Sequence, residues 1–422
     1  MSLAGMAIGL GNCWRFPYLC AQWGGGAFVL AYLIGLILIV VPIGILEVSV
    51  GKHMQAGLID VYSAAYNKPV GKVLGGVSSF CNWSQNIYYL STIAALAYLA
   101  YACVTSMWNR GVSGAEMYDH FKSSTVLYVA LFLVVLALVL YTAMRGIAKG
   151  IEVLSQYAIP AMMVLFVITF ILLAVTTPNI VEGLNYYLNP DFSQLKDPAL
   201  WAAAVAQALF SIGVGPGIML VYGSHMKKDS EIPLTMLTIC VLDTLAALLV
   251  GLTVIPACIA YGMDPQSGST LVFHVLPQVF ERIPGGNIIA LLLFIGMICA
   301  AYTSAIGNQE TALTTYGDGF HWGRKKVVLI FGALNLVFGL SAMMNVNLMT
   351  FWEKLSGDFT FLPSAALGGF TYAYIIGVKK MREEAINSSS QFKLGRWFDR
   401  WVQIVAVPMM IFFMLYTFKG LF

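Results

Sequence analysis

The sequence GLGNCWRFP, residues 9–17, lies in the first apolar segment of this 422-residue chain. Each glycine costs a helix up to about 1 kcal/mol, and proline costs about 3 kcal/mol because it lacks the backbone N–H that the helix interior needs. A second cluster, GVGPG at residues 213–217, interrupts a later apolar segment in the same way. Both segments are therefore predicted to unwind partway along an otherwise helical stretch.

The composition of the chain points to a membrane protein. Hydrophobic residues make up 59% and charged residues 10%, whereas soluble domains have about 45–50% and about 25%. These values exclude an ordinary soluble enzyme and a disordered chain. The net charge of +3, carried by scattered basic residues, excludes a nucleic-acid surface. No nucleophile and base occur at a recognisable spacing, so we expect no enzymatic activity.

Eleven apolar segments are long enough to cross a bilayer, which takes about 20 residues in a helix. Their approximate bounds are 1–22, 26–51, 73–107, 124–143, 151–176, 199–224, 232–262, 288–315, 327–344, 348–377 and 400–421. Strand-like alternation is absent, and lipid requires every backbone amide to be satisfied internally. The sequence therefore predicts an all-α polytopic protein of the cell membrane.

The distribution of Lys and Arg predicts the orientation of these segments. One set of alternate loops holds 16 of the 23 Lys and Arg residues, and the opposite set holds five. Basic loops face the cytoplasm. The N-terminus is therefore expected in the cytoplasm and, after eleven crossings, the C-terminus outside.

The two glycine clusters occupy matching positions in two blocks of five segments. Gly9 and Gly213 are 204 residues apart, and each lies in the first segment of its block. An odd number of helices per block inverts the second block relative to the first. Interrupted helices at matching places in inverted halves indicate the midplane site of a secondary transporter, although glycine-rich packing faces are an alternative. We expect one transmembrane domain with repeats over 1–176 and 198–378, a cytoplasmic linker over 379–399, and an extra helix over 400–421.

The chain resembles the neurotransmitter:sodium symporters, in particular their bacterial LeuT-like members. The resemblance is carried by residues 9–17, by GGGAF at 24–28, by QALFS at 207–211 and by Thr303-Ser304, so it covers nearly the whole chain. It implies a LeuT-like fold of two inverted five-helix repeats plus an eleventh C-terminal helix. It also implies sodium-coupled import of an amino acid by alternating access.

The resemblance also implies two sodium sites. The first would use the carbonyl of Ala7, the side chains of Asn12 and Ser211, and Asp243. The second would use the carbonyls of Gly5, Ile8 and Ala300 with the hydroxyls of Thr303 and Ser304. All these ligands are oxygens, which suit a hard cation. For each hydroxyl, a hydrogen bond back to its own helix is the alternative.

Asp243 lies inside an apolar run, where an ionisable side chain indicates a functional site. LeuT has Asn at the matching position, and its Glu one turn later corresponds to Ala247 here. Chloride-dependent relatives hold an anion nearby. A fixed carboxylate would supply that negative charge, so we expect transport without chloride; a protonated Asp243 bonded within the core is the alternative. Glu47 and Glu310 are expected to form structural hydrogen bonds.

The resemblance further implies a substrate site between the broken helices. Its expected residues are Ala7, Leu10, Gly11, Gln85, Tyr89, Phe210, Ser211, Gly213, Pro216, Ser304 and Asn308. Monoamine transporters carry Asp where this chain has Gly9, so Gly9 favours an amino acid. Gln85 and Asn308 replace apolar residues of the leucine-type pocket, which favours a polar substrate side chain unless water satisfies their amides.

Arg15 and Asp358 are expected to close the outer vestibule above a lid of Tyr89 and Phe210. Asp318 matches the acid of the inner gate, but its usual Arg partner would lie before the first residue of this sequence. A truncated reading frame, a trimmed chain and an altered inner gate all remain open. Because the half-helix that family members have there is missing from this sequence, a non-transporting amino-acid-binding sensor is an alternative to the sodium symporter. A proton-coupled amino-acid carrier on the same fold is a second alternative.

Overall fold

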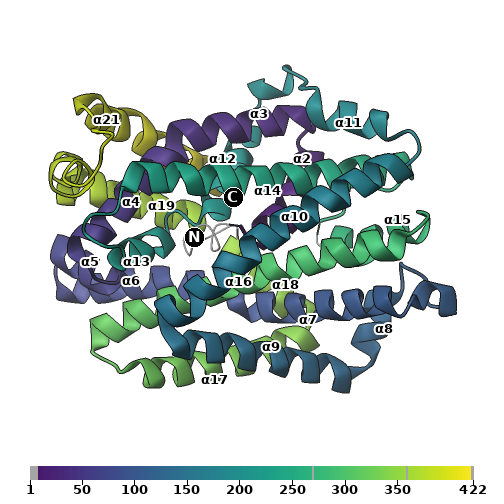
Figure 1. Ribbon diagram of the computed structural model, residues 1–422. Coiled ribbons are helices and arrows are strands. Elements are labelled where there is room, and N and C mark those ends of the chain that lie inside the picture. The colour runs from purple at the N-terminus through teal and green to yellow at the C-terminus, as the bar shows by residue number, and fades with distance from the viewer. Residues whose placement is uncertain (1–7, 269, 358–359, 420–422) are drawn as a thin grey trace.

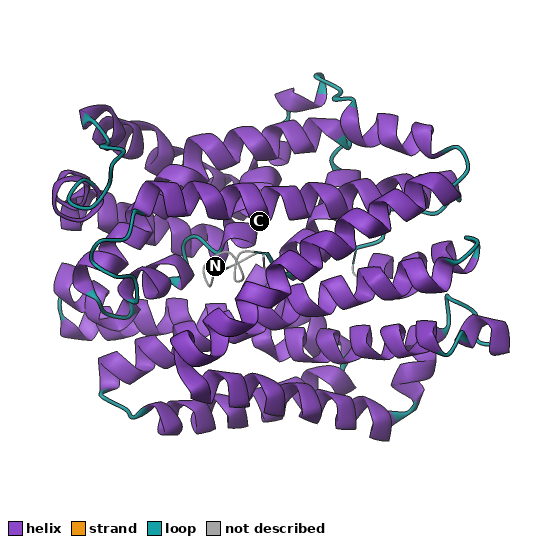
Figure 2. Cartoon of the chain, in the orientation of Figure 1, coloured by secondary structure: helices purple, strands orange, loops and turns teal. Residues whose placement is uncertain are grey.

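The computed structural model describes residues 8–268, 270–357 and 360–419. Helices connected by loops form this part of the chain, and no strand occurs within it (Figure 2). Nine of its helices are long and apolar enough to cross a membrane. These nine coincide with nine of the predicted segments, and the other two predicted segments, 1–22 and 199–224, contain the glycine clusters. The predicted all-α class is therefore confirmed.

The helices of the first half of the chain, where η denotes short 3₁₀ or π stretches, are η1 (Gly11–Arg15), α2 (Phe16–Gln22), α3 (Gly26–Gly35), η2 (Leu36–Val40), α4 (Val41–Met54), α5 (Leu58–Ala65), α6 (Lys68–Trp83), α7 (Gln85–Val104), η3 (Met107–Arg110), α8 (Met117–Ser123), α9 (Thr125–Gly146), η4 (Ile147–Ile151), α10 (Glu152–Thr176) and α11 (Ile180–Leu188). Those of the second half are η5 (Gln194–Lys196), α12 (Pro198–Ile212), α13 (Ile218–Ser224), α14 (Ile232–Ala260), η6 (Leu271–Val275), α15 (Leu276–Glu281), α16 (Gly286–Phe320), α17 (Arg324–Met344), α18 (Val346–Gly357), α19 (Phe361–Phe370), η7 (Thr371–Gly377), α20 (Val378–Met381), η8 (Arg382–Ile386), α21 (Arg396–Trp401), η9 (Val402–Ala406) and α22 (Val407–Lys419).

The long helices run side by side through the molecule (Figure 1). The 35-residue helix α16 packs against α6, α7 and α10, and α14 packs against η1, α4, α10 and α11. The broken segments lie among these long helices, because η1 contacts both α12 and α14, and α13 contacts α4 and α16. Segments from both halves of the sequence thus meet in the interior.

The break between α12 and α13 is fixed by three glycines. Gly213, Gly215 and Gly217 have φ angles of 79°, 117° and 94°, a region that side-chain-bearing residues avoid. The buried carboxylate of Glu47 accepts hydrogen bonds from the backbone N–H groups of Gly215 at 2.8 Å and Leu220 at 3.4 Å. Glu47 thus satisfies amides that the break exposes, in agreement with its predicted structural role.

The described part of the first segment begins at Ile8, next to the other glycine cluster. Ile8 and Gly9 form a bend, and helical structure starts at Leu10 and continues through η1 and α2. A helix thus starts directly after Gly9, whereas the predicted interruption also concerns the residues that precede Ile8. The residues before Ile8, including Gly5 and Ala7, lie outside the described part of the chain.

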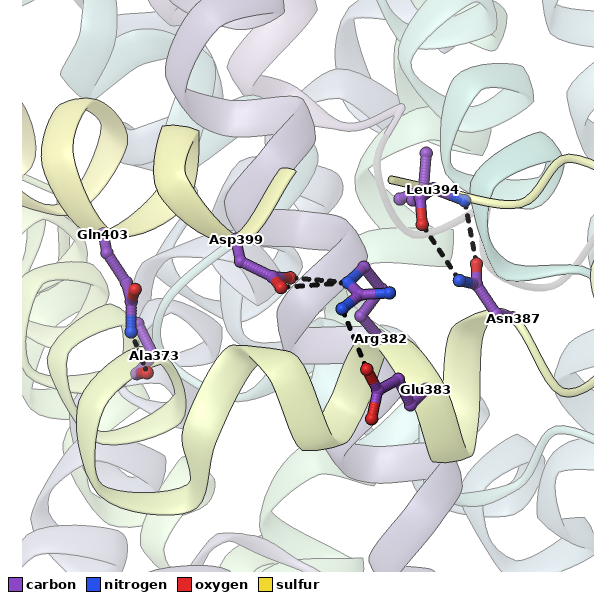
Figure 3. A network of polar contacts seen from close by, with 7 residues as sticks. All are labelled: Ala373, Arg382, Glu383, Asn387, Leu394, Asp399 and Gln403. Carbon is purple, nitrogen blue, oxygen red and sulfur yellow. Dashed lines mark hydrogen bonds and ion pairs between the residues drawn. The ribbon is translucent and has the colours of Figure 1, made fainter. Parts of the chain in front are cut away.

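The polar stretch expected as a linker over 379–399 is largely helical. The helical course of α20 and η8 continues to Ile386, α21 begins at Arg396, and the irregular part covers only 387–395. Figure 3 shows the contacts that hold this turn: Arg382 Nε donates to both carboxylate oxygens of Asp399 at 2.8 and 3.0 Å, and Asn387 exchanges two hydrogen bonds with the backbone of Leu394. These contacts join α21, and Leu394 just before it, to the first residue of η8 and to Asn387 directly after η8.

The last helix is integrated with the rest of the fold. Helix α22 packs against α12 and α19, and Trp401 Nε1 donates to the carbonyl of Leu38 at 2.8 Å. On the same side of the molecule, Lys52 Nζ donates to the carbonyl of Ser230 and to Ser389 Oγ, both at 2.6 Å. The 387–395 turn is therefore connected to the end of α4 and to the loop that precedes α14.

Candidate functional site

A buried carboxylate lies where the two broken segments meet α14. Asp243 is 0% exposed, and its oxygens accept hydrogen bonds from Asn12 Nδ2 at 2.8 Å, Tyr32 Oη at 3.2 Å and Ser211 Oγ at 2.9 and 3.0 Å. The three donors come from η1, α3 and α12. They offset part of the cost of burying a carboxylate in an apolar helix.

Asn12 connects this carboxylate to the break at Gly9. Its Oδ1 accepts the backbone N–H of Gly9 at 3.0 Å, and its Nδ2 also donates to the backbone carbonyl of Asp243 at 2.9 Å. Oxygens of Asn12, Ser211 and Asp243 therefore lie close together, and oxygen is the donor type that a sodium ion takes. Coordination by all three would require the Asn12 amide to rotate, because Nδ2 is the atom that faces the carboxylate.

The predicted residues of the second sodium site adjoin the same break on its α16 side. A Cβ atom placed on Gly9 would lie 2.1 Å from Ser304 Oγ and 3.8 Å from the carbonyl oxygen of Ala300. Thr303 Oγ1 donates to the carbonyls of Cys299 and Ala300 at 3.0 Å, the back-bonding arrangement that was the alternative. Thr303 Oγ1 is the donor in both bonds, so its lone pairs can still accept or coordinate. Ile8, another predicted residue of this site, lies directly before Gly9 in the bend.

A small cavity, with about 280 Å³ of atom-free space, lies between the two breaks. Eight predicted substrate-site residues line it, namely Gly11, Gln85, Tyr89, Phe210, Ser211, Gly213, Ser304 and Asn308. Leu10 lines the larger outer space instead, and Pro216 is not among the residues that line the cavity. Ile218 and Phe361 also line it and were not predicted.

An outer vestibule adjoins this cavity, with about 770 Å³ of space between its atoms when open solvent is included. Tyr89 and Phe210 line both spaces, so they separate the cavity from the vestibule. Arg15 donates from Nη1 to Gln207 Oε1 at 2.7 Å, and its guanidinium lies 5.2 Å from the centre of the Phe210 ring. The arginine thus packs on the aromatic lid. Its expected partner Asp358 lies outside the described residues.

Asp318, the predicted acid of the inner gate, lies near the C-terminal end of α16. Its Oδ2 accepts the backbone N–H of Gly57, the residue before α5, at 3.2 Å.

Glu310, about two turns earlier on α16, has an arginine partner. Arg324 Nη1 donates to Glu310 Oε1 at 2.9 Å, and Arg324 Nε donates to the carbonyl of Ala143 at 2.8 Å. Burial lowers the pKa of the neighbouring His225 imidazole. Glu310 therefore has a structural partner, as predicted.

Sequence reasoning missed Tyr32 as a partner of Asp243, and Ile218 and Phe361 as cavity residues. Tyr32 lies 211 residues before Asp243 in an apolar helix without polar neighbours, so no local pattern singles it out. Phe361 is the first residue of α19 and packs against Phe210, with ring centres 4.8 Å apart and ring planes tilted by 56°. Only the spatial arrangement reveals these residues.

Interrupted membrane helices that enclose buried oxygen groups define the class of secondary transporters. The sequence model of the "Sodium:neurotransmitter symporter family" matches residues 1–115 and 104–420. The chain belongs to the sodium:neurotransmitter symporter family, and it is a multi-pass membrane transporter.

Similar proteins agree with this membership. An uncharacterized sodium-dependent transporter of Bacillus subtilis is 31% identical and covers 87% of this chain and 84% of its own length. Another, from Haemophilus influenzae, is 27% identical over 97% of this chain and 94% of its own. The solved structure of MhsT in complex with L-phenylalanine covers 99% of this chain and 97% of its own, with a TM-score of 0.86 and 24% identity. The predicted LeuT-like fold class is thereby confirmed.

Proposed function

We propose that this protein imports an amino acid together with sodium by alternating access, and that it does so without chloride. The observation that carries the proposal is the cluster of Asn12, Ser211 and Asp243 directly beside the cavity between the broken helices. Binding of sodium and substrate to both broken segments would favour the closed form over the open ones, which is the requirement for coupled transport.

The cavity supports an amino acid as the substrate. Helical structure starts at Leu10, so the amides of Leu10 and Gly11 are available to the substrate carboxylate, together with the hydroxyl of Tyr89. Gly9 has no side chain that could replace a substrate carboxylate. A "Sodium-dependent nutrient amino acid transporter 1" of Drosophila grimshawi is 25% identical over 98% of this chain and 74% of its own length.

The proposed orientation in the membrane follows from the loop charges. Sixteen of the 23 basic residues fall in one set of loops, which we place in the cytoplasm with the N-terminus. Eleven crossings then place the C-terminus outside. Labelling of single cysteines in the 387–395 turn of intact cells checks this orientation, because we expect protection from an impermeant thiol reagent.

The direct test is uptake of each labelled amino acid into proteoliposomes that contain the purified chain. We expect accumulation of at least one amino acid with an inward sodium gradient, and loss of accumulation when choline replaces sodium. Uptake driven by a pH gradient without sodium would instead support the proton-coupled carrier. Sodium-dependent binding without accumulation would support the sensor.

Asp243→Asn tests the proposed role of the carboxylate in chloride independence. Wild-type uptake should be unchanged when gluconate replaces chloride. The amide keeps the size of the side chain but removes its charge, so uptake by the variant should fall at least about tenfold in gluconate and recover partly in chloride. Wild-type uptake that falls several-fold in gluconate would contradict the proposal.

A further inference from the structure

The cavity between the broken helices contains two carboxamide side chains, Gln85 from α7 and Asn308 from α16. They are 3% and 2% exposed. The other lining side chains are apolar, as in Ile218 and Phe361, or carry hydroxyls, as in Tyr89, Ser211 and Ser304, so Gln85 and Asn308 are the two amide side chains among the lining residues. The hydrogen bonds of these amides therefore decide what the cavity can accept.

Asn308 Nδ2 is buried and has no hydrogen-bond partner within the described ranges, and the whole residue is only 2% exposed. Leaving such a group without a partner is unfavourable. A substrate atom that accepts a hydrogen bond from Asn308 Nδ2 would remove this cost, whereas a methyl group would leave it in place. Asn308 thus discriminates between polar and apolar side chains of similar shape.

Gln85 supplies the second group. Its Nε2 donates to Asn82 Oδ1 at 3.1 Å, and its Oε1 has no partner among residues 8–268, 270–357 and 360–419. Asn82 Nδ2 is likewise buried without a partner there. If both amides turn over together, Asn82 donates to Gln85 Oε1 and Gln85 Nε2 becomes the free group. The pair can therefore offer either an acceptor or a donor to the substrate.

The residues that line the cavity include no charged side chain in the part of the chain that the structure describes. Asp243 lies outside the lining and is already bonded to Asn12, Tyr32 and Ser211. A charged substrate side chain would therefore be buried without a counter-charge, which is strongly unfavourable. The cavity favours a neutral group.

We propose that the transported amino acids carry a neutral side chain that both donates and accepts hydrogen bonds, a hydroxyl or a carboxamide, with Asn308 as the residue that selects them over aliphatic side chains. This inference rests on the proposed function, since it names the substrate class of the same cavity. In this proposal, Gln85 forms the second contact with the substrate side chain, and its bond to Asn82 lets it act as either donor or acceptor.

The test is sodium-dependent binding of pairs of similar shape to the purified full chain. Threonine is compared with valine, and asparagine with leucine, by displacement of a labelled amino acid that binds. We expect the polar member of at least one pair to bind at least about tenfold more tightly, because one net hydrogen bond corresponds to roughly that factor. Equal binding within both pairs, or tighter binding of both aliphatic members, overturns the inference but not the proposed function. If no amino acid binds in sodium, the proposed function itself fails.

Asn308→Leu identifies the selecting residue. It should reduce the preference for the polar member to about threefold or less, and retained binding of valine or leucine shows that the variant is folded. Asn335→Leu is the matched control, because Asn335 is likewise buried, at 0% exposed, but its Nδ2 donates to Gln309 Oε1 at 3.3 Å and it does not line the cavity. An unchanged preference in Asn308→Leu overturns the assignment. If Asn308→Leu binds no amino acid, Gln85→Met is measured instead, and its preference for the polar over the aliphatic member of each pair is compared with that of the wild type.

Discussion

Asn12 is the residue at which the break, the carboxylate and the proposed sodium ion meet. One amide group bonds to the backbone of Gly9 and to both the side chain and the backbone of Asp243. The position of the η1 helix start and the charge of α14 are therefore linked through a single side chain. A substitution of Asn12 should therefore weaken sodium binding more than it destabilises the fold.

Asn12→Ala and Thr303→Ala should each raise the sodium concentration needed for half-maximal amino-acid binding. Each removes one oxygen from a different proposed site, so we expect increases of about tenfold for Asn12→Ala and severalfold for Thr303→Ala. Titration of binding with sodium at constant ionic strength measures both. Unchanged sodium dependence in the two variants would contradict the site assignment.

At the scale of single residues, the sequence was informative where a polar residue occurs in an apolar segment. Asp243, Asn12, Gln85 and Asn308 are polar residues in apolar runs, and their cost in lipid identifies them as candidates. Tyr32 and Phe361 are ordinary aromatic residues of membrane helices. Their positions depend on packing between segments far apart in the chain, which no local pattern contains.

At the scale of elements, the break between α12 and α13 depends on backbone conformations that only glycine adopts without strain. Gly215 has the largest φ of the three, and its N–H is bonded to Glu47. The sequence predicted this interruption because GVGPG disfavours a helix at four of five positions. It could not predict the capping by Glu47, which lies 168 residues earlier.

Gly215→Ala should destabilise the protein and abolish or strongly weaken substrate binding. Its φ of 117° costs an alanine about 1–3 kcal/mol, and the added Cβ would lie 2.7 Å from the backbone of Ala365. Thermal melting of the detergent-solubilised protein and sodium-dependent binding measure the two effects.

Gly262→Ala is the control for this prediction. Gly262 also has a positive φ, 67°, but nothing lies within 4 Å of an added Cβ. The cost should therefore be limited to about 1–2 kcal/mol of backbone strain, and substrate binding should be retained. Equal effects of the two substitutions would show that close packing at Gly215 is unimportant.

At the scale of the whole molecule, the last helix is attached through a partly buried ion pair (Figure 3). The Arg382 and Asp399 side chains are 8% and 13% exposed. Asp399→Asn should lower the melting temperature, because the loss of a partly shielded partner costs more than the about 0–1 kcal/mol of an exposed pair. It should also increase hydrogen exchange in α21 more than in α16.

Glu384→Gln is the matched control for the ion pair. Glu384 is 51% exposed and 3.6 Å from His53, and exposed pairs contribute about 0–1 kcal/mol. We expect no measurable change in melting temperature. A melting temperature of Asp399→Asn equal to that of this control would show that the last helix is held by apolar packing alone.

The membrane class and the long helices were predictable because lipid leaves few alternatives to a helix. The extent of the linker was not, because the sequence around 379–386 is polar enough for a loop yet continues as helix. The ion pair between Arg382 and Asp399 is a tertiary contact, and it supports this continuation.

The length of α16 has a mechanical consequence. Its 35 residues span about 52 Å at 1.5 Å per residue, well beyond the roughly 30 Å of hydrocarbon. Thr303 and Asp318 lie on this one rod about 22 Å apart along its axis. A tilt of only about 5° around Thr303 would displace Asp318 by roughly 2 Å, enough to break its bond to Gly57. A small tilt around Thr303 would thus produce a larger displacement at the Asp318 end of the helix.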